Sequence, residues 1–560
     1  MARLPLAGPR DRPIRGLDQR QARSDHSERA TSRGPERRVT RSITERRLNT
    51  IQTPGARQTI LGQPNSLFVL FFTEMWERFS YYGMRALLVL YLISATTKGG
   101  WGWTREEATS LYGWYTMLVY LTPIIGGYIA DRLLGTRRAV VLGGFIIAAG
   151  HISLFFDTRV SFFLGLGLVI LGTGLFKPNI SAIVGQLYNK DNEGQRDGGY
   201  TLFYMGVNAG AFFGISLCGY IGEKIGWHYG FGLAAVFMIL GALQFWFGQG
   251  IFGEIGGAPN KNAPLVDASQ PLDDTPSHIV RDRLIAIGVF SFFTIFFWFA
   301  FEQAGGSMTI FAADYTDRAL VGTSGLIFKI VNSLMTLIPV AILSWLLIKL
   351  ARSTEGLYKL SNLLLAGALA LIWGLSLWML GREFQMEQSE IPATWFGVLN
   401  SFFLVILAPM FSKLWERHWN PSGPVKFGVG LVLLGLGFAA LSYGASGIPA
   451  GAKTAQVSMI FLTLAYLLHT MGELCLSPVG LSYISKLAPA RLLGLMFGVW
   501  FVNAAIANKI AGATGSYIDA ISSTYSMSTF FLIFTIIPAA AGVLLMLLSP
   551  WMKKLMHGVH

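Results

Sequence analysis

The chain has 560 residues, of which 52% are hydrophobic and only 13% charged, and its mean hydropathy is +0.49. Soluble domains of ordinary composition carry about 25% charged residues. So little polar surface cannot cover 40 Phe and 15 Trp. This composition excludes a string of soluble domains and predicts an integral membrane protein with many spans.

The net charge of +13 is concentrated at the N-terminus, where residues 1–60 hold 14 Arg and six acidic residues. This segment has no apolar core and is not a signal peptide. We expect residues 1–64 to be a disordered, basic cytoplasmic tail, or sequence upstream of the true start, and we expect no nucleic-acid binding. The two cysteines, Cys218 and Cys475, lie in apolar segments and predict neither a disulfide nor a metal site.

Fourteen apolar segments have the length of a membrane-spanning helix. They cover 67–94, 106–130, 138–157, 161–187, 199–222, 229–249, 284–312, 325–349, 357–380, 393–415, 425–444, 456–484, 491–516 and 527–550. A polar linker, 250–283, divides them into a first bundle, 65–249, and a second region, 284–550, with a short C-terminal tail, 551–560. Lys and Arg are more frequent in the loops on one side, which predicts that both termini are cytoplasmic.

The strongest functional signal is a stripe of polar residues in the first span. Glu74, Glu77, Arg78, Tyr82 and Arg85 recur at helical spacing and share one face. Each charge at the centre of a span costs about 2.5–3.5 kcal/mol to insert. Such residues mark proton relays and substrate paths, although a structural salt-bridge network is the alternative.

Three further charges stand alone deep in later spans: Lys177, Glu302 and Glu473. Each is either functional or a neutralised buried group. Ser477 lies four residues after Glu473 and faces the same way. The stripe supplies candidate partners, since Lys177 could pair with Glu74 or Glu77, and Arg85 with Glu302.

Other aromatic and amide side chains could line the same space or serve as ordinary packing. They are Tyr120, Asn208, Trp298, Asn400 and Trp500. The two halves of the chain also contain a similar short sequence: Val207-Asn208-Ala209 resembles Val502-Asn503-Ala504, 295 residues later. A repeat of six helices is typical of a transporter whose site lies between two bundles.

Two motifs resemble known families. Residues 126–138, which include Asp131 and Arg132, resemble the cytoplasmic loop motif of the major facilitator superfamily, which closes the inner gate in that family. The pattern Glu74-x-x-Glu77-Arg78-Phe79-x-Tyr81-Tyr82-Gly83 resembles the first-helix motif of the proton-dependent oligopeptide transporter family. Residues 203–210 resemble its fifth-helix motif, and the resemblance runs from about 65 to 550.

One departure from that family concerns two extra helices. Bacterial members usually insert them between the two six-helix halves, where this chain has only the linker 250–283. The stretch from Asn400 to Pro409 looks like the family's eighth helix, so the extra pair falls at about 325–380. Asn332-Ser333 offers a rival alignment for that helix. The expected fold is an all-α membrane protein of two six-helix bundles plus two extra helices.

The resemblance implies a symporter that imports di- and tripeptides with protons across the bacterial inner membrane. From the charges within the spans we expect proton coupling by Glu74, Glu77, Arg78, Lys177 and Glu302. We also expect an outer gate of Arg85 and Glu302, because both lie toward the extracellular ends of their spans. The remaining candidates for substrate binding are Tyr82, Tyr120, Asn208, Trp298, Asn400, Glu473, Ser477 and Trp500.

The basic residues Arg78, Lys177 and Arg85 suit a peptide carboxylate, and Glu473 with Asn208 and Asn400 suits an ammonium. A symporter of another small anion, such as nitrate, is the alternative, but Glu473 would then lack a cation. No nucleotide, cofactor, metal or nucleophile motif is present, so we expect no enzyme activity. We expect a monomer whose partners are peptides, protons and the lipid bilayer.

Overall fold

The computed structural model describes residues 59–188, 193–258, 276–354, 356–417, 419–489 and 492–559. The expected tail, 1–64, lies almost wholly outside the described residues, as does half of the expected linker, 250–283. Thirteen described helices are long and apolar enough to cross a membrane. A further helix of membrane length, α2 (Asn65–Ile93), carries the charged stripe.

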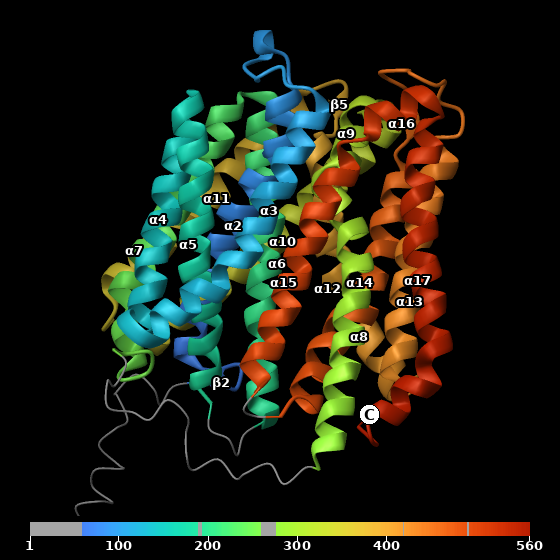
Figure 1. Cartoon of the computed structure of the whole chain (residues 1–560). Coiled ribbons are helices and arrows are strands. Elements are labelled where there is room, and N and C mark those ends of the chain that lie inside the picture. Colours follow the sequence, from blue (N-terminus) through green and yellow to red (C-terminus); the bar gives the residue numbers. More distant parts are fainter. Residues whose placement is uncertain are drawn as a thin grey trace, which may run out of the picture. The chain divides into compact units, whose positions relative to one another are not determined.

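The first bundle consists of α2 and five more long helices (Figure 1). α2 packs on α6 and α7, α3 packs on α5, and α4 packs on both α5 and α7. The bounds of the other members are α3 (Arg105–Ile129), α4 (Thr136–Phe155), α5 (Arg159–Gln186), α6 (Glu193–Lys224) and α7 (Trp227–Gly248). Short elements join or precede them: β1 (Thr59–Ile60), β2 (Gln63–Pro64), η1 (Thr96–Lys98), η2 (Ala130–Leu134) and η3 (Gln249–Phe252).

The second bundle lies beside the first in Figure 1. α13 packs on α14 and α17, α12 packs on α14, and α8 packs on α15 and α17. Its members are α8 (Ser277–Phe301), η4 (Glu302–Gly305), α9 (Ser307–Asp314), η5 (Ala393–Gly397), α12 (Val398–Arg417), α13 (Gly423–Gly444), α14 (Ile460–Leu487), α15 (Leu493–Gly515), α16 (Ile518–Thr524) and α17 (Met527–Leu555). The bundles meet where α15 packs along α3 and α12 packs on α6.

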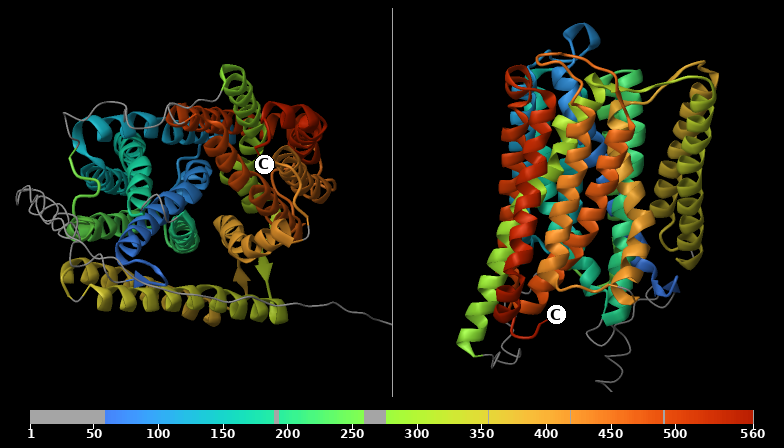
Figure 2. Two further views of the ribbon diagram at one scale, coloured as in Figure 1. Left: turned by 90° about the horizontal axis from the view of Figure 1, so that it is seen from below. Right: turned by 90° about the vertical axis from the view of Figure 1, so that its right-hand side faces the viewer.

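The extra pair, α10 (Gly322–Ser353) and α11 (Lys359–Gln385), forms a hairpin on the outside of the bundles (Figure 2). α11 packs on α7 of the first bundle, although the chain enters and leaves the hairpin from the second. Two small sheets hold its upper end. β3 (Thr316–Asp317) pairs in parallel with β6 (Val457–Ser458), and β4 (Ala319–Leu320) pairs antiparallel with β5 (Ser389–Glu390).

The helix bounds follow the sequence expectations closely except around Glu302. A single span, 284–312, was expected there, but α8 begins earlier, at Ser277, and ends at Phe301. Gly306 then takes non-helical torsions, φ −122° and ψ −103°, before α9 begins. Adjacent glycines at 305 and 306 explain this break, because glycine is the poorest helix former after proline. At the other end, α17 continues to Leu555, into the expected C-terminal tail.

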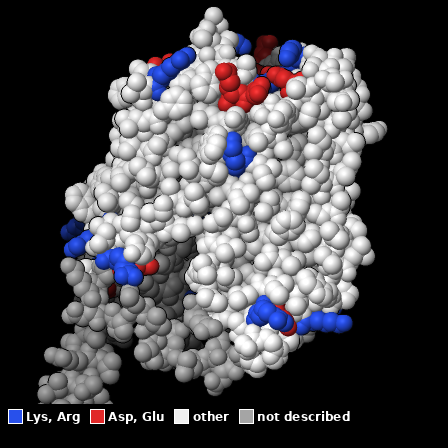
Figure 3. Space-filling view, in the orientation of Figure 1, with Lys and Arg blue, Asp and Glu red and all other residues white. Residues whose placement is uncertain are grey.

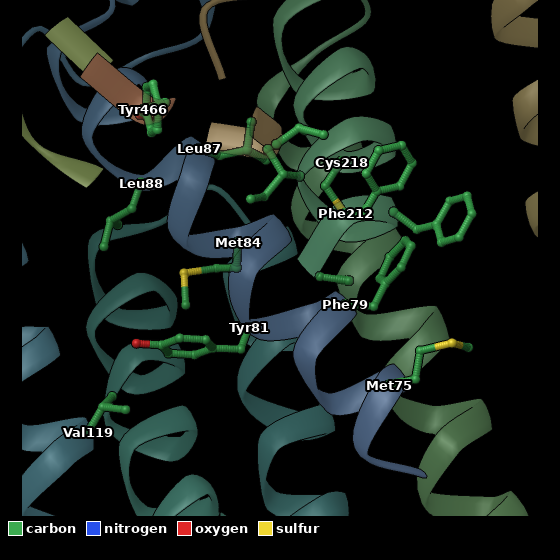
Figure 4. Packing of buried hydrophobic residues seen from close by; sticks show 14 of the residues in the cluster. Met75, Phe79, Tyr81, Met84, Leu87, Leu88, Val119, Phe212, Cys218 and Tyr466 are labelled. Carbon is green, nitrogen blue, oxygen red and sulfur yellow. The ribbon is translucent and has the colours of Figure 1, made fainter. Parts of the chain in front are cut away.

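Close packing against α6 and α7 fixes the position of α2. Figure 4 shows Phe79 and Met84 of α2 among buried side chains that include Phe212 and Cys218 of α6. A Cβ at Gly210 would lie 2.2 Å from the carbonyl oxygen of Met75. Small residues of this kind let two membrane helices approach closely. This close contact, which also includes the Cβ of Arg78, fixes the position of α2 and of its charged stripe against α6.

Candidate functional site

The stripe on α2 forms a compact, buried charge cluster. Arg78 Nε lies 2.8 Å from Glu74 Oε1 and 3.1 Å from Glu77 Oε2. Glu74 and Glu77 are 2% and 0% exposed. The Oε2 atom of Glu74 and both carboxylate oxygens of Glu77 accept no hydrogen bond from the described residues. Two carboxyl groups thus share one guanidinium, which leaves room for a proton or a second cation.

Lys177 of α5 is the nearest candidate for that second cation. Its Nζ lies 4.3 Å from the ring centre of Tyr120, which it faces as a cation–π contact. It forms no ion pair within 4 Å among the described residues, so the expected bridge to Glu74 or Glu77 is not made in this conformation. Both glutamates are within its electrostatic range. Lys177 is therefore positioned near the cluster without being neutralised by it.

The second bundle contributes a buried acid of its own. Asn400 of α12 donates a hydrogen bond of 2.9 Å to Glu473 Oε2 and lies 3.2 Å from Thr470 Oγ1. Glu473 is 8% exposed and has no cation within 4 Å among the described residues. The hydroxyl of Ser477, one turn further along α14, is buried and has no described partner. This corner of the site offers acceptors for a positively charged group.

Arg85 and Glu302 join the two bundles. Arg85 Nη2 contacts Glu302 Oε2, and Arg85 Nε donates a hydrogen bond of 2.7 Å to the hydroxyl of Tyr112. The rings of Tyr82 and Tyr112 lie 5.9 and 5.4 Å from the guanidinium carbon. The break after α8 presents Glu302 to this pair. The expected Arg85–Glu302 contact is present and is almost completely buried.

A second connection between the bundles lies nearer the upper end. Arg105, at the start of α3, is 2.5 Å from Asp314 Oδ2 and 2.7 Å from Asp519 Oδ1. Below it, Gly113 of α3 touches Gly512 of α15, and a Cβ at Gly113 would lie 2.7 Å from the Cα of Gly512. The upper halves of the bundles are therefore tightly closed.

The remaining predicted residues occupy varied environments. Asn208 donates to the carbonyl oxygen of Tyr204, one turn earlier on α6. Trp298 packs edge-on against Phe297 and Phe301, and the ring of Trp500 lies against Gly480. Asp131 and Arg132 are exposed on η2, where Arg132 contacts the ring of Tyr128. Neither residue forms an ion pair with a described residue of the second bundle.

Sequence reasoning missed Arg105, Tyr112, Thr470 and Tyr204 as members of the site. Tyr204 lies one helical turn before Asn208, and Thr470 lies three residues before Glu473, so both share a face with a predicted residue. This helical spacing could have identified Tyr204 and Thr470 from the sequence. Arg105 and Tyr112 gave none, because their partners are distant in sequence.

The lower half of the region between the bundles is open. The described ion pairs that join the two bundles all lie toward the upper end. Tyr204, which is within electrostatic range of Glu473 and Arg78, is 46% exposed. Figure 3 shows charged residues gathered near the two ends, an almost uncharged band between them, and a hollow in the lower half of this face.

Comparison with known proteins identifies a family. The model of the POT family matches residues 137–268 and 375–531. The chain is 36% identical to "Uncharacterized transporter YclF" of Bacillus subtilis, covering 89% of this chain and 96% of that one. It is 34% identical to "Di-/tripeptide transporter" of Lactococcus lactis subsp. lactis, covering 90% and 98%.

Solved structures agree with this assignment. A crystal structure of "peptide transporter POT in complex with sulfate" superposes with a TM-score of 0.70 at 30% identity, covering 90% of this chain and 98% of that one. A "POT family transporter in complex with thioalcohol conjugated peptide" gives 0.70 at 26% identity, covering 88% and 98%. These similarities confirm the expected major facilitator fold.

Proposed function

Because this chain belongs to the POT family of transporters, we propose that it imports di- and tripeptides together with protons. One observation carries the proposal. Glu473, a buried acid, has a hydrogen-bond donor in Asn400 but no cation within 4 Å among the described residues, whereas the other bundle holds Arg78 and Lys177. A zwitterion with its charges a short peptide apart complements both groups.

Charge complementarity assigns an orientation to the substrate. The peptide carboxylate binds Arg78 and Lys177 of the first bundle, and the ammonium binds Glu473 of the second. Tyr204 and Asn208 of α6 line the space between these groups. Because only the termini meet charges, side chains of different size are accepted. Tyr82, Tyr120, Trp298, Ser477 and Trp500 remain candidates for shaping the pocket.

Coupling to protons follows from competition for two cations. When the site is empty, Arg78 pairs with both Glu74 and Glu77, and Lys177 is close enough for its charge to be attracted by the two carboxylates. An arriving carboxylate draws these cations toward itself, and a glutamate that loses its cation must take up a proton or remain as a buried, unpaired charge. The neutral form costs far less in the membrane, so peptide and proton binding are linked.

Alternating access supplies the transport step. Arg85–Glu302 and the Arg105 pairs close the upper end, while the lower end is open. With the Lys- and Arg-rich loops facing the cytoplasm, this conformation faces inward, and Asp131 and Arg132 are free to close the inner side in the opposite conformation. The protein acts as a monomer in the bacterial inner membrane, with both termini cytoplasmic and no cofactor.

Uptake by the purified protein in liposomes tests this function. The internal concentrations of dialanine, alanine and nitrate are compared with and without an inward proton gradient, with protein-free liposomes as the control for leakage. We expect dialanine alone to accumulate, and only with the gradient. Accumulation of nitrate without dialanine would favour the anion symporter, in which Glu473 has no role, and gradient-independent accumulation of dialanine would refute proton coupling.

A further inference from the structure

A cavity in the second bundle lies apart from the charged site. It has a volume of about 670 Å³ and is lined by the lower parts of α12 and α14, the start of α13 and the end of α17. Lys426, Lys486 and Lys553 line it, and its described lining contains no Asp or Glu. Three basic side chains from three helices therefore converge on one space.

The polar end of this cavity is arranged around Lys426. Its Nζ lies 2.7 Å from Asn420 Oδ1 and 4.6 Å from the ring centre of Trp415. Lys426 and Lys486 are close enough to repel each other. An anion placed among these lysines would be attracted by their charges, and it would reduce the repulsion between Lys426 and Lys486.

The rest of the lining has the opposite character. Ala408 and Phe411 of α12 and Leu474 and Val479 of α14 extend the cavity toward the middle of the membrane. A small inorganic anion would leave this apolar part unused. An amphiphile would fill both ends, with its charge among the lysines and its chain between α12 and α14.

We propose that this cavity binds the phosphate group of an anionic phospholipid from the cytoplasmic leaflet, with one acyl chain between α12 and α14. The inference uses the orientation given above but does not depend on the substrate. Basic pockets between helices on the cytoplasmic side suit such headgroups, and lysine is a strongly hydrated point charge that binds phosphate. α12 and α14 also carry Asn400 and Glu473. The bound lipid therefore stabilises the relative position of the two helices that hold the acidic half of the site.

The test uses the full-length protein, stripped of lipid in detergent. Phosphatidylglycerol, phosphatidylethanolamine and inorganic phosphate are titrated separately, with the unfolding midpoint and the lipid retained in native mass spectrometry as the two measurements. A ligand that binds only the folded protein raises the midpoint with concentration. We expect phosphatidylglycerol to raise it and to be retained, and the other two probes to do neither. A comparable effect of inorganic phosphate would identify a soluble-anion site and overturn the lipid proposal.

Matched variants separate this cavity from general positive charge. K426Q/K486Q/K553Q removes the three lining lysines, and K413Q/K554Q removes neighbouring lysines that lie outside the lining. Each lysine near an anionic lipid contributes about fivefold in affinity, so the triple variant should bind phosphatidylglycerol about a hundredfold more weakly and the control almost normally. The exposed Lys553 provides a variant that folds safely, and K553Q alone should weaken binding about fivefold. Equal losses in both sets, or no loss in K553Q and the triple variant, would refute the site.

Discussion

Arg85 of α2 and Glu302 at the break after α8 form a buried ion pair that joins the two bundles at their closed end. The hydroxyl of Tyr112 lies beside both, 2.7 Å from Arg85 Nε and 3.4 Å from Glu302 Oε2. The pair exists only while the bundles are in contact at this level. We therefore expect its charge state to change which conformation is favoured, because a proton on Glu302 removes the attraction to Arg85.

Replacing Glu302 by Gln should open the upper end. Removing one partner of a buried ion pair costs about 3–5 kcal/mol, and here the closed conformation bears that cost because Arg85 is left unpaired. Labelling of a cysteine introduced below the gate should become faster from the outside. E387Q is the control, since Glu387 is exposed at the same end and forms no described ion pair. Unchanged labelling in E302Q would show that the Arg85–Glu302 pair is a static contact and not a gate.

Arg105 should contribute to closure more weakly than Glu302. Its acidic partners are 31% and 37% exposed, so water can replace the lost cation, and R105Q should cost the closed state about 1 kcal/mol. Outside labelling of R105Q, D519N and the double variant forms a double-mutant cycle. Strictly additive effects of the two substitutions would show that Arg105 and Asp519 do not act together.

These two sets of ion pairs show what sequence can and cannot predict. Helical periodicity is enough to place Glu74 and Arg78 on one face of α2, because residues four apart meet on a helix. An isolated charge in a span indicates a buried partner, and the stripe on α2 offers Arg85 as a partner for Glu302. Arg105 gave no such signal, since it looked like an ordinary loop residue.

Its partners Asp314 and Asp519 are 209 and 414 residues away. Only the tertiary packing of α3 against the second bundle brings them together. The hairpin illustrates the same limit. Its two helices follow from hydropathy, but no pattern in α11 predicts that it packs on α7, because each of its faces is apolar and both lipid and protein accept such a surface.

Glu473 should bind the peptide's amino terminus. E473Q keeps the shape and the hydrogen-bonding capacity toward Asn400 but loses the charge. Breaking a desolvated charge pair costs about 2 kcal/mol or more, so the KM for dialanine should rise about thirtyfold. N-acetyl-dialanine, which has no ammonium, should be affected less than threefold. E416Q on the exposed end of α12 serves as the control. Equal loss for both peptides would reject this orientation of the substrate.

Glu77 should couple the proton to the peptide. Its carboxylate accepts no hydrogen bond from the described residues, and Arg78 is shared with Glu74. E77Q and K177A should abolish accumulation driven by a proton gradient. E77Q should retain part of peptide-for-peptide counterflow, which needs the loaded site to reorient but no net proton movement. A wild-type rate of accumulation in E77Q would mean that the cluster is structural.

Glu223, at the upper end of α6, should stabilise the junction that leads from the hairpin into α12. Its carboxylate accepts hydrogen bonds of 2.9 Å from the backbone N–H groups of Ala393 and Thr394, and one of 2.7 Å from the Thr394 hydroxyl. These groups begin η5, where backbone N–H groups have no partner within the helix and favour a negative charge. The Trp395 indole also donates to the carbonyl oxygen of Ser216, so η5 is tied to α6 twice.

The neighbouring Lys224 provides a matched comparison. It forms an ion pair of 2.8 Å with Glu390, whose side chain is 50% exposed. Exposed pairs contribute about 0–1 kcal/mol, whereas hydrogen bonds to a charged, partly buried group contribute about 1.5–3 kcal/mol each. E223Q should therefore lower the unfolding midpoint clearly more than K224Q does. Because the amide of Gln can still accept one hydrogen bond, E223A should lower it further. If K224Q and E223A were equally destabilised, the cap on η5 would contribute nothing to holding the hairpin and α12 against the first bundle.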